Sequence, residues 1–258
     1  MSLNPPMANW NGKTVWLVGA SSGIGRATAA ALHAQGARVI VSARNAQALK
    51  QFTTEHPGAI AMALDVTDAQ TVQEATSQVF ALGPLDGMVY CAGHYTAMDA
   101  DAIDLPDMLR HVDINYVGAL QLLSAVLPHM LARGPRAGSF VSLVGSVAGY
   151  VGLPRSLAYG PTKAALINLA QTLYLDLRGK GIAVSIINPG FVETPLTARN
   201  SFHMPALLTP QQAASAILQG WARGAFEIHF PKRFTFWLKL LALLPWWLFF
   251  KLVGRVAR

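Results

Sequence analysis

Seven short apolar runs alternate with longer segments of helical periodicity along this chain, and this alternation restricts the possible folds more than any other feature. The runs are rich in Val, Ile, Leu and Ala and do not alternate apolar with polar positions, which is typical of strands buried on both faces. They span Val15–Gly19, Ala37–Ser42, Ala59–Leu64, Gly87–Cys91, Ser139–Val144, Ala183–Ile187 and Phe226–Phe230. The helical segments span Gly23–Gln35, Ala46–Glu55, Ala69–Leu82, Leu105–Arg133, Ser156–Gly179 and Gln211–Arg223. We therefore predict an α/β fold, a doubly wound parallel sheet of about seven strands with right-handed crossovers.

Length and composition fit one folded domain with a C-terminal extension. The chain has 258 residues, of which 52% are hydrophobic and 13% charged, so a large core is available and extended disorder is excluded. Composition changes only after Pro231, which predicts a domain over 8–231 and an apolar, basic helical extension over 232–258. Residues 1–7 lie outside the predicted domain. Cys91 is the single cysteine, and with no secretory signal pattern we expect a reducing, cytoplasmic location.

The net charge of +7 is concentrated in the C-terminal extension. Six of the 20 basic residues follow Pro231 and no acidic residue does, so the first 231 residues hold 14 basic against 13 acidic residues. A nearly neutral body argues against a nucleic-acid partner. The six cations lie among Trp237, Trp246 and Trp247, a combination that indicates a membrane surface or another interface.

A glycine-rich turn joins the first predicted strand to the first helix, with the sequence Gly19-Ala20-Ser21-Ser22-Gly23-Ile24-Gly25. Glycines at such a turn let the backbone bend tightly and let a pyrophosphate approach the helix N-terminus, where unpaired N–H groups and the helix dipole favour an anion. A plain tight turn uses the same residues. The strand–turn–helix context favours a dinucleotide site.

The end of the second strand bears on cofactor choice, because the adenosine ribose lies there in this type of fold. The segment Val41-Ser42-Ala43-Arg44-Asn45 has no carboxylate to pair with a free 2′-hydroxyl, and the Arg44 guanidinium suits a 2′-phosphate. We therefore predict NADP(H) in preference to NAD(H), although Arg44 can also be a solvated loop residue. Asp65-Val66 follows the third strand and is a candidate adenine contact, while Asp68 is better placed to cap the next helix.

Tyr159 and Lys163 are spaced i, i+4 on a predicted helix, so their side chains project from one face. A phenol has an ordinary pKa of about 10, and a nearby ammonium is expected to lower that pKa toward the working range of a general acid or base. Ser146 follows a strand, where carboxyl-end loops line the crevice of an open sheet, and its hydroxyl can hold a substrate oxygen.

Together these segments resemble the short-chain dehydrogenase/reductase family over roughly residues 11–230, in family order and at family spacing. The resemblance also includes Asp113-Ile114-Asn115-Tyr116-Val117-Gly118, which is similar to the segment carrying the family's asparagine. Ser146-Val147-Ala148-Gly149 and Tyr159-Gly160-Pro161-Thr162-Lys163 resemble its catalytic segments. Asn188-Pro189-Gly190, with Val192 and Thr194 after it, is similar to the segment that touches the nicotinamide.

The resemblance implies a Rossmann-like fold and a role for each matching residue. Tyr159 would be the general acid in reduction and the general base in oxidation, and Ser146 would orient the carbonyl. Lys163 would lower the pKa of Tyr159 and hold the nicotinamide ribose. Asn115, at an expected helix irregularity, would hold a water linking Lys163 to solvent. The remaining implied cofactor contacts are Gly19, Ser21, Ser22, Gly23, Ile24, Gly25, Arg44, Asp65, Val66, Ala92, Gly93, Pro189, Gly190, Val192 and Thr194.

Two departures from the family pattern are visible. Tyr90-Cys91-Ala92-Gly93 stands where the family has Asn-Asn-Ala-Gly, so backbone contacts with the adenine ring can persist while the asparagine hydrogen bonds are lost. Gly145 stands where a second serine commonly precedes the catalytic one. We expect Cys91 to be small, buried and not a nucleophile. We predict no metal site, because the seven histidines show no ligand spacing.

Two other functions fit parts of the chain. Gly19-Ala20-Ser21-Ser22-Gly23 also matches the G-x-S-x-G pattern of a serine hydrolase with Ser21 as nucleophile. That pattern follows several strands in α/β-hydrolases, whereas here it follows the first, and it leaves Tyr159 and Lys163 unexplained. A cofactor-binding sensor or scaffold without turnover is the other alternative, and the intact Ser–Tyr–Lys set argues against it.

The C-terminal extension is the part of the chain that bears on binding partners. Phe234–Val253 is interrupted by Lys239 and Pro245, so we predict two short helices meeting at Pro245, not a spanning helix, which needs about 20 apolar residues. In the second helix Trp247, Lys251, Arg255 and Arg258 form a stripe opposite Phe249, Phe250, Leu252, Val253 and Val256. Such a helix fits a membrane interface, or a subunit contact, because the family resemblance implies homodimers or homotetramers.

The segment after Gly190 is expected to close the substrate pocket. It is apolar at Leu196, Phe202, Met204, Pro205 and Leu207, with Arg199 as its one candidate anion clamp. We therefore predict a hydrophobic alcohol, ketone or aldehyde as substrate.

Overall fold

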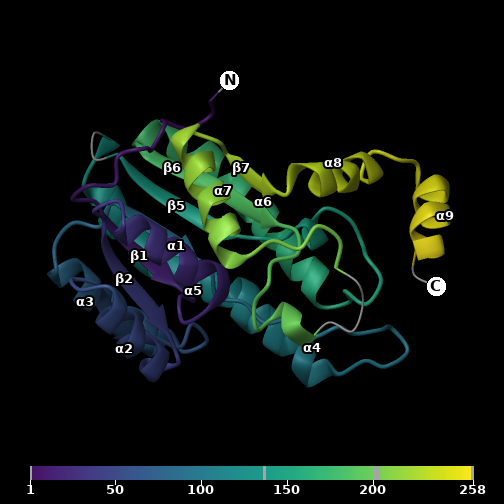
Figure 1. Ribbon diagram of the computed structural model, residues 1–258, viewed down its shortest axis with the longest axis horizontal. Coiled ribbons are helices and arrows are strands. Elements are labelled where there is room, and N and C mark those ends of the chain that lie inside the picture. The colour runs from purple at the N-terminus through teal and green to yellow at the C-terminus, as the bar shows by residue number, and fades with distance from the viewer. Residues whose placement is uncertain (1, 136–137, 200–203, 257–258) are drawn as a thin grey trace.

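A parallel sheet lies at the centre of the molecule (Figure 1). The computed structural model describes residues 2–135, 138–199 and 204–256. Within them seven strands pair in the order β3-β2-β1-β4-β5-β6-β7, all parallel. The strands are β1 (Thr14–Val18), β2 (Arg38–Ala43), β3 (Ile60–Ala63), β4 (Gly87–Tyr90), β5 (Ser139–Val144), β6 (Ile182–Pro189) and β7 (Glu227–Phe230). The predicted doubly wound sheet is confirmed, with strand ends within one or two residues of those expected.

Helices cover both faces of the sheet. Successive strand residues point to opposite faces, and both sets are apolar, so each face must be buried. In β1, Val15 and Leu17 belong to one buried cluster and Trp16 to the other. The first cluster is covered by α1 (Gly23–His33), α2 (Ala46–Glu55) and α7 (Pro210–Ala222). The second is covered by α3 (Ala69–Ala81), α5 (Gly118–Ala132) and α6 (Tyr159–Leu177).

The predicted long helix Leu105–Arg133 is continuous but carries a π-helical turn in its middle. It consists of α4 (Leu105–Val112), the π turn η1 (Asp113–Val117) and α5. The expected irregularity at Asn115 is confirmed, because Asn115 lies in η1. By length and composition Leu105–Ala132 is apolar enough to cross a membrane, but half of its most apolar window is buried inside the protein. It is therefore a core helix of the domain.

Two predicted boundaries beside the later site were wrong. α6 begins at Tyr159 and not at Ser156, because Ser156 forms a β-bridge with Met98 and the next two residues form a turn. Tyr159 is therefore the first residue of its helix. β6 continues to Pro189, because its last residues pair with β7. A short 3₁₀ helix, η3 (Val147–Gly149), follows β5.

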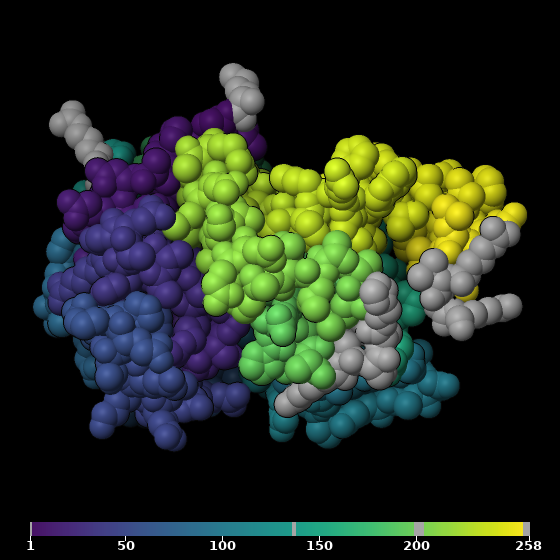
Figure 2. Space-filling view, viewed as in Figure 1, coloured from purple at the N-terminus to yellow at the C-terminus, as the bar shows by residue number. Residues whose placement is uncertain are grey.

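Two short helices follow β7, as predicted. They are α8 (Lys232–Leu241) and α9 (Trp246–Val256), with Pro245 immediately before the second. α8 lies along the body of the protein, whereas α9 lies beyond it and forms one end of the molecule (Figures 1 and 2, yellow).

The N-terminal residues, which precede the predicted domain, make hydrogen bonds to the body of the protein. Asn4 is buried, and its side chain donates to the carbonyl oxygen of Val184 (2.8 Å) and accepts from the N–H of Val184 (3.2 Å). The N–H groups of Leu3 and Asn4 both donate to the carbonyl oxygen of Gly224. Hydrogen bonds to an interior strand of the sheet thus hold this segment in place.

Candidate functional site

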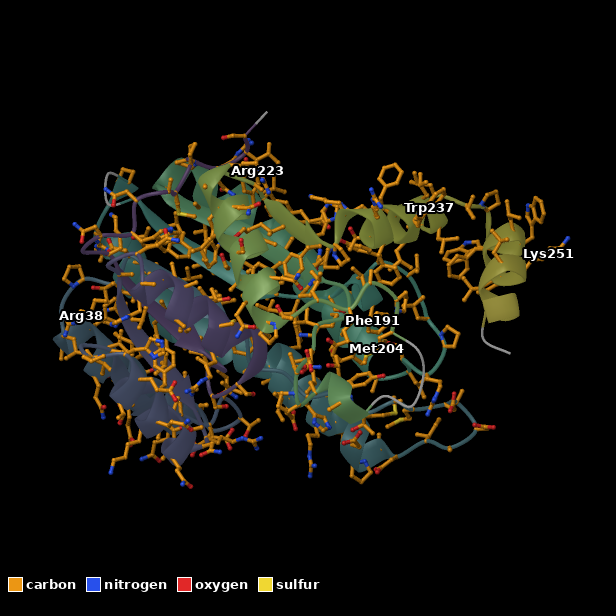
Figure 3. The ribbon with its side chains drawn as sticks, viewed as in Figure 1. Arg38, Phe191, Met204, Arg223, Trp237 and Lys251 are labelled. Atoms are coloured by element: carbon orange, nitrogen blue, oxygen red, sulfur yellow. The ribbon has the colours of Figure 1, made fainter. Side chains whose placement is uncertain are left out.

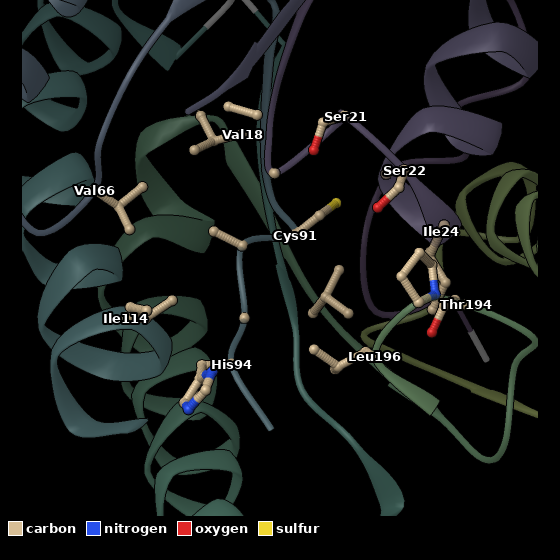
Figure 4. A pocket seen from close by; sticks show the side chains of 18 of the residues that line it. Val18, Ser21, Ser22, Ile24, Val66, Cys91, His94, Ile114, Thr194 and Leu196 are labelled. Carbon is tan, nitrogen blue, oxygen red and sulfur yellow. The ribbon is translucent and has the colours of Figure 1, made fainter. Parts of the chain in front are cut away.

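A cleft of about 440 Å³ opens at the carboxyl ends of the strands, where β1 lies between β2 and β4. This is the switch point of a doubly wound sheet, because β2 and β3 lie on one side of β1 and the later strands lie on the other. Ser21 and Ser22 line one wall, and His94 and Ile114 lie across the cleft from them (Figure 4). All residues predicted to contact the cofactor line this cleft, as do Ser146, Tyr159 and Lys163. The structure thus brings these residues together, and their roles stay predictions.

The glycine turn fits tightly between two neighbouring strands. Gly19 has φ 90°, and a Cβ there would lie 2.3 Å from the backbone nitrogen of Ala92. A Cβ on Gly25 would lie 2.5 Å from the carbonyl oxygen of Gly19. Ser22 is the N-cap of α1, yet its side chain makes no capping hydrogen bond, and the first turn of α1 holds no acidic residue. The first N–H groups of α1 are therefore available to an anion in the cleft.

The end of the cleft beside β2 carries an exposed cation. Arg44 follows β2 and lines the cleft, and among the residues that the structure describes no carboxylate pairs with it. Asp65 also lines the cleft, but its Oδ1 accepts hydrogen bonds from the N–H (3.0 Å) and hydroxyl (2.8 Å) of Thr67. Asp68 accepts from two N–H groups at the start of α3, which confirms the predicted cap.

Tyr159 and Ser146 meet in the cleft as the sequence predicted. Ser146 follows β5, Tyr159 begins α6, and both line the cleft. Burial raises the pKa of Tyr159 to about 12, and the nearby Ser146 hydroxyl offsets part of that rise. The ring of Tyr95 packs edge-on against Tyr159, with centroids 4.9 Å apart. The phenol is therefore held protonated, in the form of a general acid.

The role of Lys163 toward Tyr159 stays a prediction, and in the structure the ammonium is bound to a backbone carbonyl. Lys163 is 3% exposed, and its Nζ donates to the carbonyl oxygen of Val144 (2.9 Å). The ammonium lies 5.5 Å from the centre of the Tyr159 ring. Burial lowers the pKa of Lys163 itself to about 8, so desolvation acts on both groups and dominates the pKa of the phenol.

Asn115 lies behind the cleft wall and fastens the loop after β4. Its Nδ2 donates to the carbonyl oxygen of His94 (3.0 Å) and to Thr162 Oγ1 (3.0 Å), and its Oδ1 accepts from the N–H of His94 (2.7 Å). A Cβ on Gly93 would lie 3.5 Å from Asn115 Oδ1 and 3.7 Å from Lys163 Nζ. The π turn therefore holds Asn115 next to the lysine across Gly93.

Tyr90 and Cys91, which stand where the resembled family has two asparagines, have separate structural roles. Tyr90 is fully buried, and its hydroxyl donates to the carbonyl oxygen of Ile114 in the π turn (2.5 Å). A Cβ on Gly118 would lie 2.6 Å from that hydroxyl, so glycine is needed opposite Tyr90. Cys91 is half-buried in the cleft wall, and burial raises the pKa of its thiol to about 12. A protonated thiol is a poor nucleophile, and the absence of a nucleophilic role for Cys91 stays a prediction.

Sequence analysis missed a hydrogen-bonded group beside the cleft. His94 Nε2 donates to Asp107 Oδ1 (2.7 Å), and His111 Nδ1 lies 2.7 Å from the carbonyl oxygen of Asp107. Because the N–H of Thr96 donates to His111 Nε2, the proton of His111 is on Nδ1. Burial lowers the pKa of His111, which favours this neutral form.

The same three side chains bear on the metal prediction. Candidate ligand atoms of His94, Asp107 and His111 lie within 4.8 Å of one another. The i, i+4 spacing of Asp107 and His111 on a helix was the sequence signal that we overlooked. Since both ring nitrogens of His111 have protein partners, we interpret the group as a hydrogen-bond network, and the absence of a metal site stays a prediction.

A second cluster connects the Ser146 segment and the end of β6 to the C-terminal extension. Glu227 Oε1 accepts from the Tyr150 hydroxyl (2.5 Å) and from Asn188 Nδ2 (3.0 Å), while Oε2 accepts from Lys239 Nζ. Tyr150 follows the Ser146 segment, Asn188 precedes Pro189 at the end of β6, and Lys239 is on α8. A lone glutamate in a short strand carries no sequence signal for such a role.

The predicted lid is only partly in the cleft. Leu196 lines it, and Met204 is half-buried, whereas Pro205 and Leu207 are exposed. Leu208 pairs with Val192, so its neighbour Leu207 points the opposite way, as successive residues of an extended segment do. Phe202 lies outside the described residues, as does the side chain of Arg199.

Comparisons with known proteins agree with this geometry. A sequence model described as short chain dehydrogenase matches residues 13–204. An uncharacterized oxidoreductase of Myxococcus xanthus is 36% identical over 244 residues, covering 93% of this chain and 95% of that protein. The 2-keto-3-deoxy-L-fuconate dehydrogenase of Xanthomonas campestris is 34% identical over 190 residues, covering 74% of this chain and 62% of that protein. A short chain dehydrogenase/reductase from Burkholderia phymatum, solved in complex with NAD, shares the fold with a TM-score of 0.82 at 21% identity, covering 91% of this chain and 94% of that one.

Proposed function

The chain belongs to the short-chain dehydrogenase family of oxidoreductases, and on that premise we propose that it uses NADP(H) to interconvert a hydrophobic alcohol and the matching ketone or aldehyde. One observation carries the proposal. Tyr159 and Ser146 line the same cleft as the glycine turn at the start of α1. A proton donor and an anion cradle therefore open into one space.

The residues of the cleft fit a dinucleotide. Gly19, Gly23 and Gly25 leave the backbone of the turn bare, and the uncapped start of α1 offers N–H groups to a pyrophosphate. Asp65 and Val66 would contact the adenine, and the segment Pro189–Thr194 would border the nicotinamide. A bound nicotinamide cofactor supplies or accepts the hydride of the reaction.

The chain's own side chains handle the proton and the substrate oxygen. In reduction, Tyr159 donates its proton to the carbonyl oxygen, and in oxidation the phenolate takes it from the alcohol. The Ser146 hydroxyl holds the same oxygen by a hydrogen bond. Lys163 lies one helical turn from Tyr159, where its ammonium, bonded to the β5 carbonyl, can hold a ribose hydroxyl. Asn115 keeps the loop of His94 in place on the far side of Gly93.

The preference for NADP(H) rests on charge at the end of β2. The Arg44 guanidinium is exposed, free of a carboxylate partner among the described residues, and lines the cleft. A 2′-phosphate offers it a forked, charge-assisted hydrogen bond, whereas a 2′-hydroxyl offers no charge to pair with.

A panel of alcohols, ketones and aldehydes, assayed by NADPH absorbance with NADH in parallel, tests the proposal. We expect turnover of apolar members and a higher kcat/KM with NADP(H) than with NAD(H). Tight NADPH binding without turnover of any member would favour the sensor or scaffold alternative. Labelling of Ser21 by a fluorophosphonate would instead support the hydrolase alternative.

A further inference from the structure

The outward face of α8 carries large apolar side chains, where an ordinary surface helix carries polar ones. A helix on a soluble protein buries its apolar stripe and exposes polar residues. On α8 the exposed side chains include Phe236 (58% exposed), Trp237 (67%) and Leu240 (36%), which recur at helical spacing, whereas Thr235 and Leu238 face the protein and are buried. Trp237 points away from the body of the molecule (Figure 3).

α9 continues this apolar surface beyond the body of the protein. Leu243, in the connection, is 80% exposed, and Trp246, Trp247 and Phe250 are 71%, 70% and 63% exposed. Lys251 is exposed next to them and points outward at the end of the molecule (Figure 3). Together, the exposed side chains of α8, the connection and α9 form what we call the aromatic face.

Charge indicates which partner suits the aromatic face. The extension carries six basic and no acidic residues after Pro231, and Lys232, Arg233 and Lys251 are exposed on α8 and α9. A second copy docking symmetrically would place these cations against each other. An anionic bilayer instead accepts cations at its phosphates and Trp and Phe rings at headgroup level.

The helices are too short to cross a membrane. α8 has 10 residues and α9 has 11, so each is roughly 15 Å long, about half of the ~30 Å hydrocarbon core. The aromatic face therefore fits a position in the plane of the membrane surface.

The inward face of α8 is joined to the active-site loops. Lys239 pairs with Glu227, which also holds Tyr150 and Asn188. The rings of Phe234 and Phe191 are 5.7 Å apart, and a Cβ on Gly190 would lie 3.0 Å from the Phe234 ring. A membrane bound to α8 would thus lie close to the segment that follows the nicotinamide contacts.

We propose that α8 and α9 bind the surface of an anionic bilayer through the aromatic face, and that the hydrophobic substrate reaches the cleft from that lipid phase. The second part rests on the proposed oxidoreductase function, and the first does not. Binding can therefore be tested without turnover.

Flotation of the full chain with vesicles provides the test. We expect the protein to float with vesicles of phosphatidylcholine and phosphatidylglycerol, to float several-fold less with phosphatidylcholine alone, and to be released by salt. The double variant Trp237→Ser/Trp247→Ser should lose flotation, because it removes one exposed tryptophan from each of the two helices. Leu175→Ser is the matched control, since Leu175 on α6 is 65% exposed outside the aromatic face, and it should float like the wild type.

Point variants are preferable to removing the extension, because truncation would also break the contacts of Lys239 and Phe234. Unfolding curves and NADPH binding of the double variant should match those of the wild type, which shows that only the surface changed. A wild type that fails to float with anionic vesicles overturns the proposal. So does a wild-type dimer, seen by sedimentation, that the double variant cannot form, because the aromatic face would then be a subunit interface.

Discussion

At the scale of single residues, burial governs the chemistry of the site. The pKa of Tyr159 is raised to about 12 and that of Lys163 is lowered to about 8, in both cases chiefly because the charged form loses water. The two side chains are i, i+4 neighbours, yet the ammonium is directed to the Val144 carbonyl oxygen and not to the phenol. Tyr159 therefore carries the proton that the proposed reduction uses.

The expected pH dependence of turnover follows from the raised pKa of Tyr159. Oxidation needs the phenolate, whose fraction rises roughly tenfold per pH unit below the pKa of Tyr159. We predict that kcat/KM for alcohol oxidation rises with pH through and above neutrality, while kcat/KM for carbonyl reduction, which uses the protonated phenol, stays level. Initial rates in both directions, across buffers of constant ionic strength, check this. An oxidation profile without a pH-dependent rise contradicts it.

Arg44 gives a prediction about cofactor choice. Charge-assisted hydrogen bonds contribute about 1.5–3 kcal/mol, so Arg44→Ala should weaken NADPH binding roughly ten- to a hundredfold and leave NADH binding nearly unchanged. Fluorescence titration measures both affinities. Arg38→Ala is the control, because Arg38 is an exposed arginine at the opposite end of β2. An equal loss of affinity for both cofactors would show that Arg44 does not recognise the 2′-phosphate.

At the scale of elements, the π turn η1 places the asparagine of the site. It carries Asn115 inside a long helix, and its Ile114 carbonyl oxygen is bonded to the Tyr90 hydroxyl of β4. Tyr90 stands where the resembled family has asparagine, so this chain supports the turn with a phenol. The missing Cβ at Gly118 makes room for that hydroxyl.

Removal of the hydroxyl tests this support. We predict that Tyr90→Phe lowers the free energy of unfolding by about 1–3 kcal/mol, because a buried carbonyl loses its hydrogen bond. Urea unfolding of both proteins measures the difference. Tyr116→Phe, in the same turn but with its ring only partly buried, should change stability far less. Equal effects of the two substitutions would argue against a specific role for Tyr90.

Sequence patterns predicted the elements well where a local signal exists. The apolar runs predicted each strand of the described sheet within two residues, and Pro245 predicted the break between α8 and α9. The start of α6 was mispredicted, because the bridge between Ser156 and Met98 joins segments that are far apart in the sequence. The site residues were predicted by their spacing, whereas their pKa values depend on burial, and the partners of Glu227 and Asp107 depend on contacts between distant segments.

At the scale of the whole molecule, Glu227 joins the body to the extension. Burial alone would raise the pKa of Glu227, but hydrogen bonds from Lys239, Tyr150 and Asn188 lower it below its ordinary value. A carboxyl group with a lowered pKa stabilises the fold above its unfolded-state pKa, and this stabilisation is lost as the pH falls through the folded-state pKa.

Glu227→Gln keeps the shape but removes the charge. We predict a loss of about 1–3 kcal/mol in unfolding free energy at neutral pH, and a smaller loss in acid, where the wild-type carboxylate is also protonated. Urea unfolding at both pH values measures this. Glu193→Gln, at an exposed glutamate in the lid segment, is the control and should have little effect. A loss that does not depend on pH would mean that the charge of Glu227 is not the cause.

The most direct test of the whole account is the turnover of Tyr159→Phe with a carbonyl substrate accepted by the wild type. The phenylalanine ring keeps the packing against Tyr95 but has no proton to give. We predict that kcat falls by about 10²- to 10⁴-fold while NADPH affinity stays that of the wild type. Turnover close to the wild-type rate, with the cofactor bound equally well, would contradict the central claim that Tyr159 is the acid of this enzyme.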